Sequence, residues 1–111
     1  MSSAWEHFLA ATTTLAAPGP IKHRLVEAYR VHLATLDLDE VPKEIREDFF
    51  TLSSCMCSVP PLRGENAVQA TVRKMSDMEA GGMAVRIVNM LGVIARQQTS
   101  QRPKLRAVGD D

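Results

Sequence analysis

Two cysteines separated by one residue are the first side chains in this sequence that could carry chemistry. Cys55 and Cys57 fall in a segment with helical periodicity, and thiols two positions apart on a helix point about 160° away from each other. Such a pair neither closes a comfortable disulfide nor clamps one tetrahedral metal ion. Zinc sites also need a second ligand pair, which the sequence lacks. We expect a structural role for both thiols, redox sensitivity being the alternative, and neither a metal nor any other cofactor.

The three histidines do not form a catalytic set. His7 and His23 fall on two different predicted helices, and His32 lands inside the apolar stripe of the second one. A histidine on an apolar face is usually a core residue with one satisfied hydrogen bond, whereas general acid–base catalysis needs converging polar groups. We therefore predict no catalytic residue and no enzyme. A small enzyme is the third-ranked hypothesis, and it requires a pocket at His32 that holds a second polar group.

Charge is divided unevenly along a chain whose formal net charge is zero, with 13 basic and 13 acidic residues. Residues 37–48 carry a net charge of −4, and residues 63–106 carry +5. One interpretation is a solvated acidic face and a basic tail. The other is that the opposite patches orient a charged partner or a second copy. On the second interpretation the partner-binding residues are Arg63, Arg73, Lys74 and Arg86.

The elements that position these side chains are predicted to be helices. The chain has 111 residues with 5% aromatic residues, and its apolar content of Ala, Leu, Met and Val favours helix over strand. Capping boxes at Ser3 and Ser76, and prolines at 20 and 42, mark helix starts. The predicted helices span residues 4–16, 20–36, 42–57, 65–74 and 76 to 96 or 98. Ile45, Phe49, Leu52 and Met56 form the clearest buried stripe.

These elements predict an all-α fold, a compact orthogonal bundle of about five helices with a disordered C-terminal tail. Residues 1–98 form the single domain, and residues 99–111 form the flexible tail, because they show no periodicity. The longest apolar run, Met90 to Ala95, is far shorter than the ~20 residues that span a bilayer. We therefore expect a soluble, cytoplasmic protein with no membrane partner.

The last helix is predicted to be the most buried one, because apolar residues cover more than half of its circumference. Gly81, Val85, Val88 and Gly92 form a narrow seam of small side chains along one flank. Glycine in a helix interior costs up to ~1 kcal/mol relative to alanine, so the seam needs a reason. We expect another helix of the same chain to pack closely against it. The alternative is a homodimer through the Gly81 to Gly92 flank.

Two binding interpretations compete around the start of the last helix. The turn at residues 74–76 resembles that of a helix-turn-helix protein, which makes a nucleic-acid binder the alternative function. A recognition helix shows polar residues in its first turns, whereas this one reads Met78, Ala80 and Gly81, so nucleic-acid binding is not expected. Methionines 75, 78, 83 and 90 gather here. They fill the core or, alternatively, line a groove for a partner helix.

Three segments carry a family resemblance. Residues 41–49, 59–62 and 70–76, reading VPKEIREDF, VPPL and ATVRKMS, resemble small all-helical bacterial proteins with no assigned activity. The resemblance implies a bacterial, cytoplasmic helical domain and transfers no functional residue. The leading hypothesis is a non-enzymatic protein–protein interaction or regulatory module with an unknown protein partner. Its partner surface would be the stiff loop at residues 60–63 with the basic flank of the last two helices.

Overall fold

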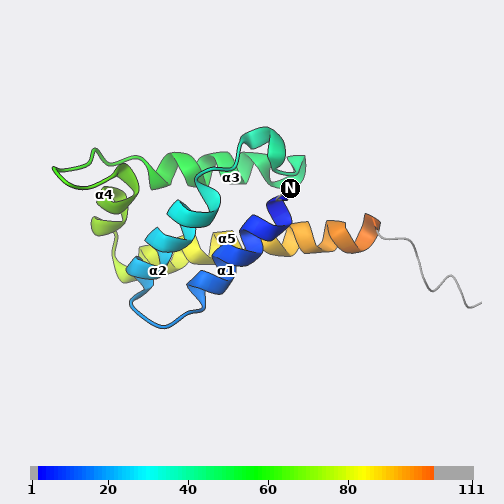
Figure 1. Ribbon diagram of the computed structural model, residues 1–111, viewed down its shortest axis with the longest axis horizontal. Coiled ribbons are helices and arrows are strands. Elements are labelled where there is room, and N and C mark those ends of the chain that lie inside the picture. The colour runs from blue at the N-terminus through cyan, green and yellow to red at the C-terminus, as the bar shows by residue number, and fades with distance from the viewer. Residues whose placement is uncertain (1–2, 102–111) are drawn as a thin grey trace, which may run out of the picture.

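Helices are the regular elements of residues 3–101, the part of the chain that the computed structural model describes. Five α-helices form a compact orthogonal bundle (Figure 1), which confirms the predicted all-α fold: α1 (Ala4–Leu15), α2 (Ile21–Glu27), α3 (Lys43–Met56), α4 (Ala67–Arg73) and α5 (Asp77–Gln101). A π-helical turn, η1 (Ala28–Leu33), continues α2, and a 3₁₀ turn, η2 (Leu38–Glu40), precedes α3. Residues 102–111, most of the predicted tail, lie outside the described residues, and α5 extends three residues beyond the predicted end at 98.

Reciprocal capping bonds begin three of the five α-helices. At α1 the Ser3 hydroxyl accepts from the backbone N–H of Glu6 at 3.3 Å, and the Glu6 carboxylate accepts from the Ser3 N–H at 3.2 Å. The same exchange joins Ser76 and Glu79 before α5, at 3.0 and 2.8 Å. Both boxes were predicted from the sequence. A third, between Asn66 and Gln69 at α4, was not, and its amide side chains play the same roles as serine and glutamate.

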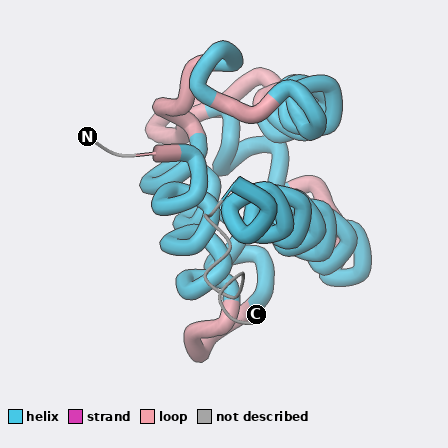
Figure 2. Tube along the Cα trace, turned by 90° about the vertical axis from the view of Figure 1, so that its right-hand side faces the viewer, coloured by secondary structure: helices cyan, strands magenta, loops and turns pink. Residues whose placement is uncertain are grey.

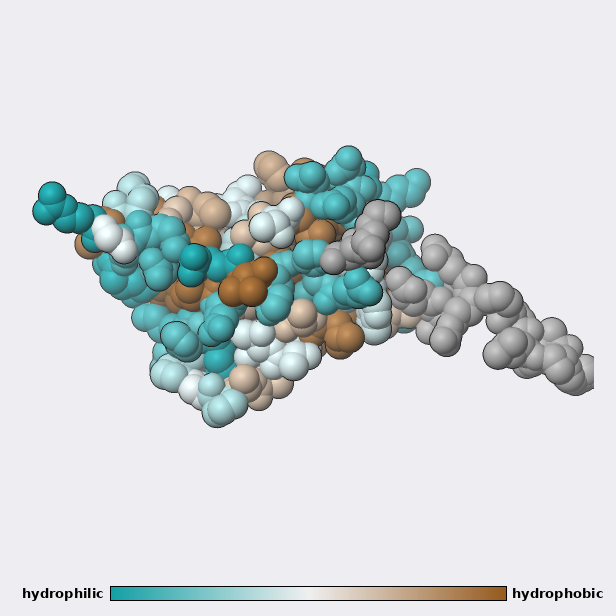
Figure 3. All heavy atoms as spheres, viewed as in Figure 1, coloured by the Kyte–Doolittle hydropathy of each residue, from teal (hydrophilic) through white to brown (hydrophobic). Residues whose placement is uncertain are grey.

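The core lies where α5 packs against α1, α2 and α3. In Figure 2, which shows α5 nearly along its axis, α1 lies to one side of it and α3 lies above it. The predicted stripe of α3, made of Ile45, Phe49, Leu52 and Met56, is buried throughout. The Phe8 ring of α1 meets the Phe49 ring edge-on, with centroids 5.7 Å apart. Hydrophilic residues cover much of the face in Figure 3, where hydrophobic residues appear as separate patches.

The continuation of α2 departs from the regular helix that the sequence predicts. The Ala34 N–H donates to the Tyr29 carbonyl at 2.8 Å, so this turn contains one residue more than an α-helical turn. The turn buries Tyr29 and Leu33 while His32 is only half-buried. The His32 Nε2 lies 3.2 Å from the Thr14 hydroxyl, and the His7 Nδ1 donates to the His32 carbonyl at 2.6 Å. His32 thus joins η1 to α1 at the edge of the core.

The prediction that α5 is the most buried helix is wrong. Only one face packs on the other helices, through Ala80, Ala84, Ile87, Met90 and Ile94. On the opposite face Met78, Val85 and Val88 are 87%, 57% and 43% exposed. The stretch Asp77–Gln97 is long and apolar enough to cross a membrane, with a mean hydropathy of 1.3, yet only 22% of its most apolar 18-residue window is buried. The apolar residues that widen this helix's hydrophobic arc therefore face outward.

The predicted packing of another helix against the Gly81 to Gly92 seam is also wrong. A Cβ atom added at Gly81 would meet no atom within 4 Å, and at Gly92 it would meet only a guanidinium nitrogen of Arg96, at 3.9 Å. The glycines therefore do not admit a neighbouring helix of the same chain. The homodimer alternative is unaffected by this correction.

Replacing Gly82 with alanine should stabilise the fold. Gly82 lies inside α5, and an added Cβ would meet nothing within 4 Å, so the variant gains helix propensity without a clash. We expect its free energy of unfolding to rise by about 0.5–1 kcal/mol in urea titrations. Gly19→Ala is the contrasting control, because its φ of +116° strains any L side chain. A loss of stability in Gly82→Ala would contradict the open space above α5.

Candidate partner-binding cavities

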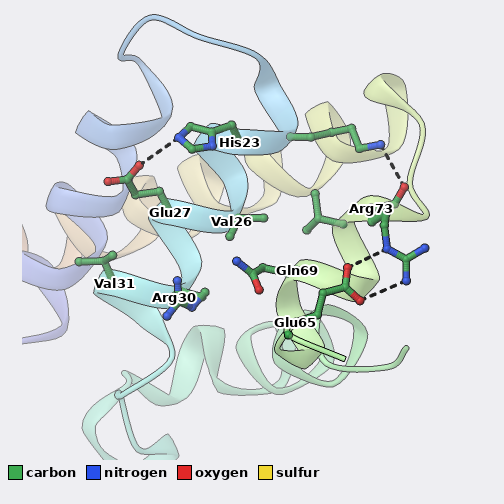
Figure 4. A pocket seen from close by; sticks show the side chains of 11 residues that line it. His23, Val26, Glu27, Arg30, Val31, Glu65, Gln69 and Arg73 are labelled. Carbon is green, nitrogen blue, oxygen red and sulfur yellow. Dashed lines mark hydrogen bonds and ion pairs between the residues drawn. The ribbon is translucent and has the colours of Figure 1, made fainter. Parts of the chain in front are cut away.

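The larger of two candidate sites is a groove between α2, η1 and α4, which we call the α2–α4 groove (Figure 4). Its volume is 570 Å³, and Val26, Val31 and Val72 supply apolar lining. Arg30 enters from η1, and Gln69 enters from α4. The remaining lining residues are polar or charged residues of α2, α4 and the preceding loop, together with Gly64: Lys22, His23, Glu27, Gly64, Glu65 and Arg73.

Most charged groups in the α2–α4 groove already bind each other. The Glu65 carboxylate accepts from Arg73 Nε at 2.7 Å and from Arg73 Nη2 at 3.2 Å, and these bonds hold the pKa of Glu65 below its usual value. Lys22 Nζ donates to the Arg73 carbonyl at 3.2 Å, and His23 lies 3.6 Å from Glu27. These contacts tie α4 to α2 and to its own loop, so the groove has a structural function of its own.

Acid should remove the contribution of Glu65 to stability. Its folded pKa is lowered from 4.5, chiefly by the bonds from Arg73, so the contribution is present above that ordinary pKa and disappears as the pH falls through the folded value. We expect wild type to be more stable than Glu65→Gln in urea at about pH 7 and the difference to vanish towards about pH 2. Asp39→Asn is the control, because the Asp39 side chain forms no ion pair among the described residues. A difference independent of pH would contradict the pairing.

The second site is a cavity of 480 Å³ between the end of α3, α4 and the first half of α5, which we call the α4–α5 cavity. Val59, Met75 and Met83 supply its apolar lining. Lys74 and Arg86 bring two cations to it, and within the described residues neither forms an ion pair with a carboxylate. Arg86 Nη1 lies instead 3.9 Å from the sulfur of Met83. The further lining residues are Cys55, Ser58, Thr71, Glu79 and Gly82.

Thr71 holds one wall of the α4–α5 cavity in place. Its hydroxyl accepts from the Val59 N–H at 3.0 Å and donates to the Ala67 carbonyl at 2.8 Å, and the residue is only 4% exposed. The loop after α3 is thereby anchored to α4 just before Pro60 and Pro61, whose rings restrict the backbone further. The cavity wall is therefore a fixed surface.

The structure separates the four predicted partner-binding residues. Lys74 and Arg86 line the same α4–α5 cavity, whereas Arg73 lines the α2–α4 groove and is paired with Glu65. Arg63 is exposed on the loop and lines neither site. Sequence reasoning missed Lys22 and Arg30. Their spacing with Val26, four residues each way, marks one helix face and could have revealed them.

The acidic segment at residues 37–48 extends along α5 as far as Arg86, because Asp48 and Arg86 line one small cavity of 160 Å³. Gln97 of α5 hydrogen-bonds to Glu44 at the start of α3, and this bond is the largest cause that lowers the pKa of Glu44. Arg46 donates to the Val41 carbonyl at 3.1 and 2.7 Å, and among the described residues it forms no ion pair with a carboxylate of the segment. The acidic segment therefore reaches one of the two cations that line the α4–α5 cavity.

Both cysteines carry free thiols. Cys55 is half-buried and lines the α4–α5 cavity, whereas Cys57 is exposed at the end of α3. Cys57 also lies near Tyr29: burial is the main cause that raises the pKa of Tyr29, Ser53 opposes it by hydrogen bonding, and Cys57 adds to it. Among residues 3–101 no three His, Cys, Asp or Glu side chains are grouped so that they could hold a metal ion. Both thiols thus lie at the end of α3, where Cys55 faces the α4–α5 cavity and Cys57 is exposed.

The resemblance to a helix-turn-helix motif ends at the first turn of α5. There the exposed side chains are Asp77, Met78 and Glu79. Two carboxylates at this position would repel the phosphates of a nucleic acid, whereas recognition helices offer cationic or neutral polar groups.

Comparison with known proteins gives no relative. No family model matches the chain, and no curated protein or solved structure matches it significantly.

Proposed function

We propose that this chain is a non-enzymatic protein–protein interaction module of the bacterial cytoplasm. Its α4–α5 cavity would bind an amphipathic helical segment of a partner, whose acidic residues face Lys74 and Arg86. The observation that carries the proposal is the position of these two cations, unpaired with any carboxylate of the described chain, beside an apolar cavity. Two free cysteines are consistent with a reducing compartment.

The chemistry of the cavity suits a peptide better than a reaction. Methionine side chains are flexible and polarisable, and they adapt to different apolar groups of a bound helix. Cations at the edge of an apolar cavity steer an acidic partner and fix its orientation. His32, the residue required by the enzyme hypothesis, lines neither of the two sites described above. The α2–α4 groove is less suited to a partner because its Arg73 is paired with Glu65 and its Lys22 donates to the Arg73 backbone carbonyl.

A peptide selection tests the proposal directly. We expect a random peptide library displayed on phage to yield amphipathic sequences that combine apolar anchors with aspartate or glutamate. Lys74→Glu with Arg86→Glu should weaken their binding by at least about tenfold, because both cations become repulsive to the peptide. The measurement is the Kd of a synthetic selected peptide by calorimetry.

The matched control reverses two cations in the other site. Lys22→Glu with Arg30→Glu changes the net charge of the chain by the same amount, so a general electrostatic effect would weaken the peptide equally. Equal weakening by both double variants would refute the α4–α5 cavity as the binding site. Binding of duplex DNA that is lost in Lys74→Glu with Arg86→Glu would support the nucleic-acid alternative instead.

A further inference from the structure

One face of α5 is apolar, exposed and separate from the α4–α5 cavity. Met78, Gly81, Val85, Val88 and Gly92, which we call the α5 stripe, fall within about 80° around the helix axis. Met78, Val85 and Val88 are 87%, 57% and 43% exposed, and a Cβ atom at Gly81 would meet no atom within 4 Å. Natural monomers seldom leave large apolar surfaces uncovered, so three exposed apolar side chains on one helix face indicate a contact surface.

The spacing of the two glycines and two valines of the α5 stripe is symmetric. Around the midpoint between Arg86 and Ile87, Gly81 mirrors Gly92 and Val85 mirrors Val88. A second α5 running antiparallel, related by a two-fold axis through this midpoint, would therefore set glycine level with glycine and valine level with valine. Such a self-complementary contact is the form that two-fold dimers use. The glycines allow the two backbones to approach closely.

Charges at the ends of α5 also match a second antiparallel copy. Exposed Asp77 begins the helix, and exposed Arg96 mirrors it about the same midpoint. The Arg96 guanidinium reaches back over the stripe, 3.9 Å from the Cβ position of Gly92. An antiparallel pair sets Arg96 level with Asp77 of the second copy at both ends and opposes the helix dipoles. A parallel pair would instead place Asp77 beside Asp77.

We infer that two copies of this chain associate through the α5 stripe with antiparallel helices. A single helix pair covers less than the ~800 Å² per partner of a standard interface, so the dimer should dissociate in the micromolar range. The α5 residues of the α4–α5 cavity, Glu79, Gly82, Met83 and Arg86, lie on another side of the helix. The dimer would therefore present two cavities and bind divalent partners with avidity.

Sedimentation equilibrium of the full chain from about 1 to about 200 μM tests the association. We expect a monomer–dimer equilibrium in wild type and at least a tenfold higher dissociation constant in Val85→Asp. Phe50→Asp is the matched control, since Phe50 is equally exposed, at 58%, but lies on α3. Circular dichroism verifies that each variant folds. If Val85→Asp does not fold, Gly81→Leu replaces it, because leucine adds bulk where the monomer has space.

A distance measurement tests whether the two α5 helices of the dimer are antiparallel. A spin label at Met78→Cys, in a Cys55→Ser and Cys57→Ser background, should report about 25 Å between the two labelled backbone positions for antiparallel helices and about 10 Å for parallel ones. A chain that is monomeric at every concentration overturns the inference, as does a short distance. Binding of the monomer to phospholipid vesicles that Val85→Asp abolishes would assign the stripe to a membrane surface and overturn it as well.

Discussion

Phe8→Ala should lower the free energy of unfolding by about 3–5 kcal/mol, a large part of the stability of a domain of this size. The Phe8 side chain is fully buried, and its ring packs edge-on against Phe49, with centroids 5.7 Å apart. Truncation leaves a cavity where α1 meets α3 and removes a favourable aromatic pair. Urea unfolding followed by circular dichroism measures the change.

Phe50→Ala, the same substitution at an exposed position, is the control. It separates the loss of core packing from changes in helix propensity or aromatic content. Phe50 is next to Phe49 on α3 but is 58% exposed, and Phe50→Ala should change stability by no more than about 0.5 kcal/mol. Similar losses in Phe8→Ala and Phe50→Ala would mean that α1 does not pack on α3 as the structure has it.

Local sequence signals predicted the helices whose ends and faces depend on neighbouring residues in the chain. The capping boxes at Ser3 and Ser76 place side chains three residues apart, and both form. The buried face of α3 follows from residues spaced by three and four positions. The π-helical turn was not predicted, because it depends on contacts that His32 and Tyr29 make with α1 and α3.

Burial of α5 was mispredicted because periodicity shows which residues are apolar and not which of them a neighbour covers. The apolar arc of α5 includes Ile87, which is fully buried, and Val88, which is 43% exposed. The hydropathy of these two residues is nearly equal, so only the positions of α1, α2 and α3 decide between them. An apolar arc wider than the packed face is thus itself a signal for a second contact.

For the charged residues, too, the sequence predicted contacts that depend on nearby positions and missed those that depend on how distant segments fold together. Lys74 and Arg86 were predicted as binding residues and lie together at the α4–α5 cavity, since only a short turn separates α4 from α5. Arg73 was predicted with them, but its partner Glu65 is eight positions earlier and meets it only because the loop folds back over α4. Counting charges along the chain does not show which of them are neutralised.

Thr71→Val should lower the free energy of unfolding by about 1–3 kcal/mol although it preserves the shape of the side chain. The Thr71 hydroxyl is the hydrogen-bond acceptor for the Val59 N–H at 3.0 Å, and valine leaves that donor without a partner in a partly buried position. Urea unfolding measures the loss. Hydrogen exchange at the Val59 amide should accelerate, because the loop after α3 loses its attachment to α4.

Thr13→Val is the control for the hydroxyl itself. The Thr13 hydroxyl donates to the Leu9 carbonyl four residues earlier at 2.9 Å, as Thr71 does to Ala67, but it is exposed. We therefore expect Thr13→Val to be nearly neutral and Thr71→Ser to restore most of the stability. Since Val59 and Thr71 both line the α4–α5 cavity, Thr71→Val should also weaken a selected peptide. Unchanged Val59 exchange in Thr71→Val would show that this hydroxyl does not hold the cavity wall.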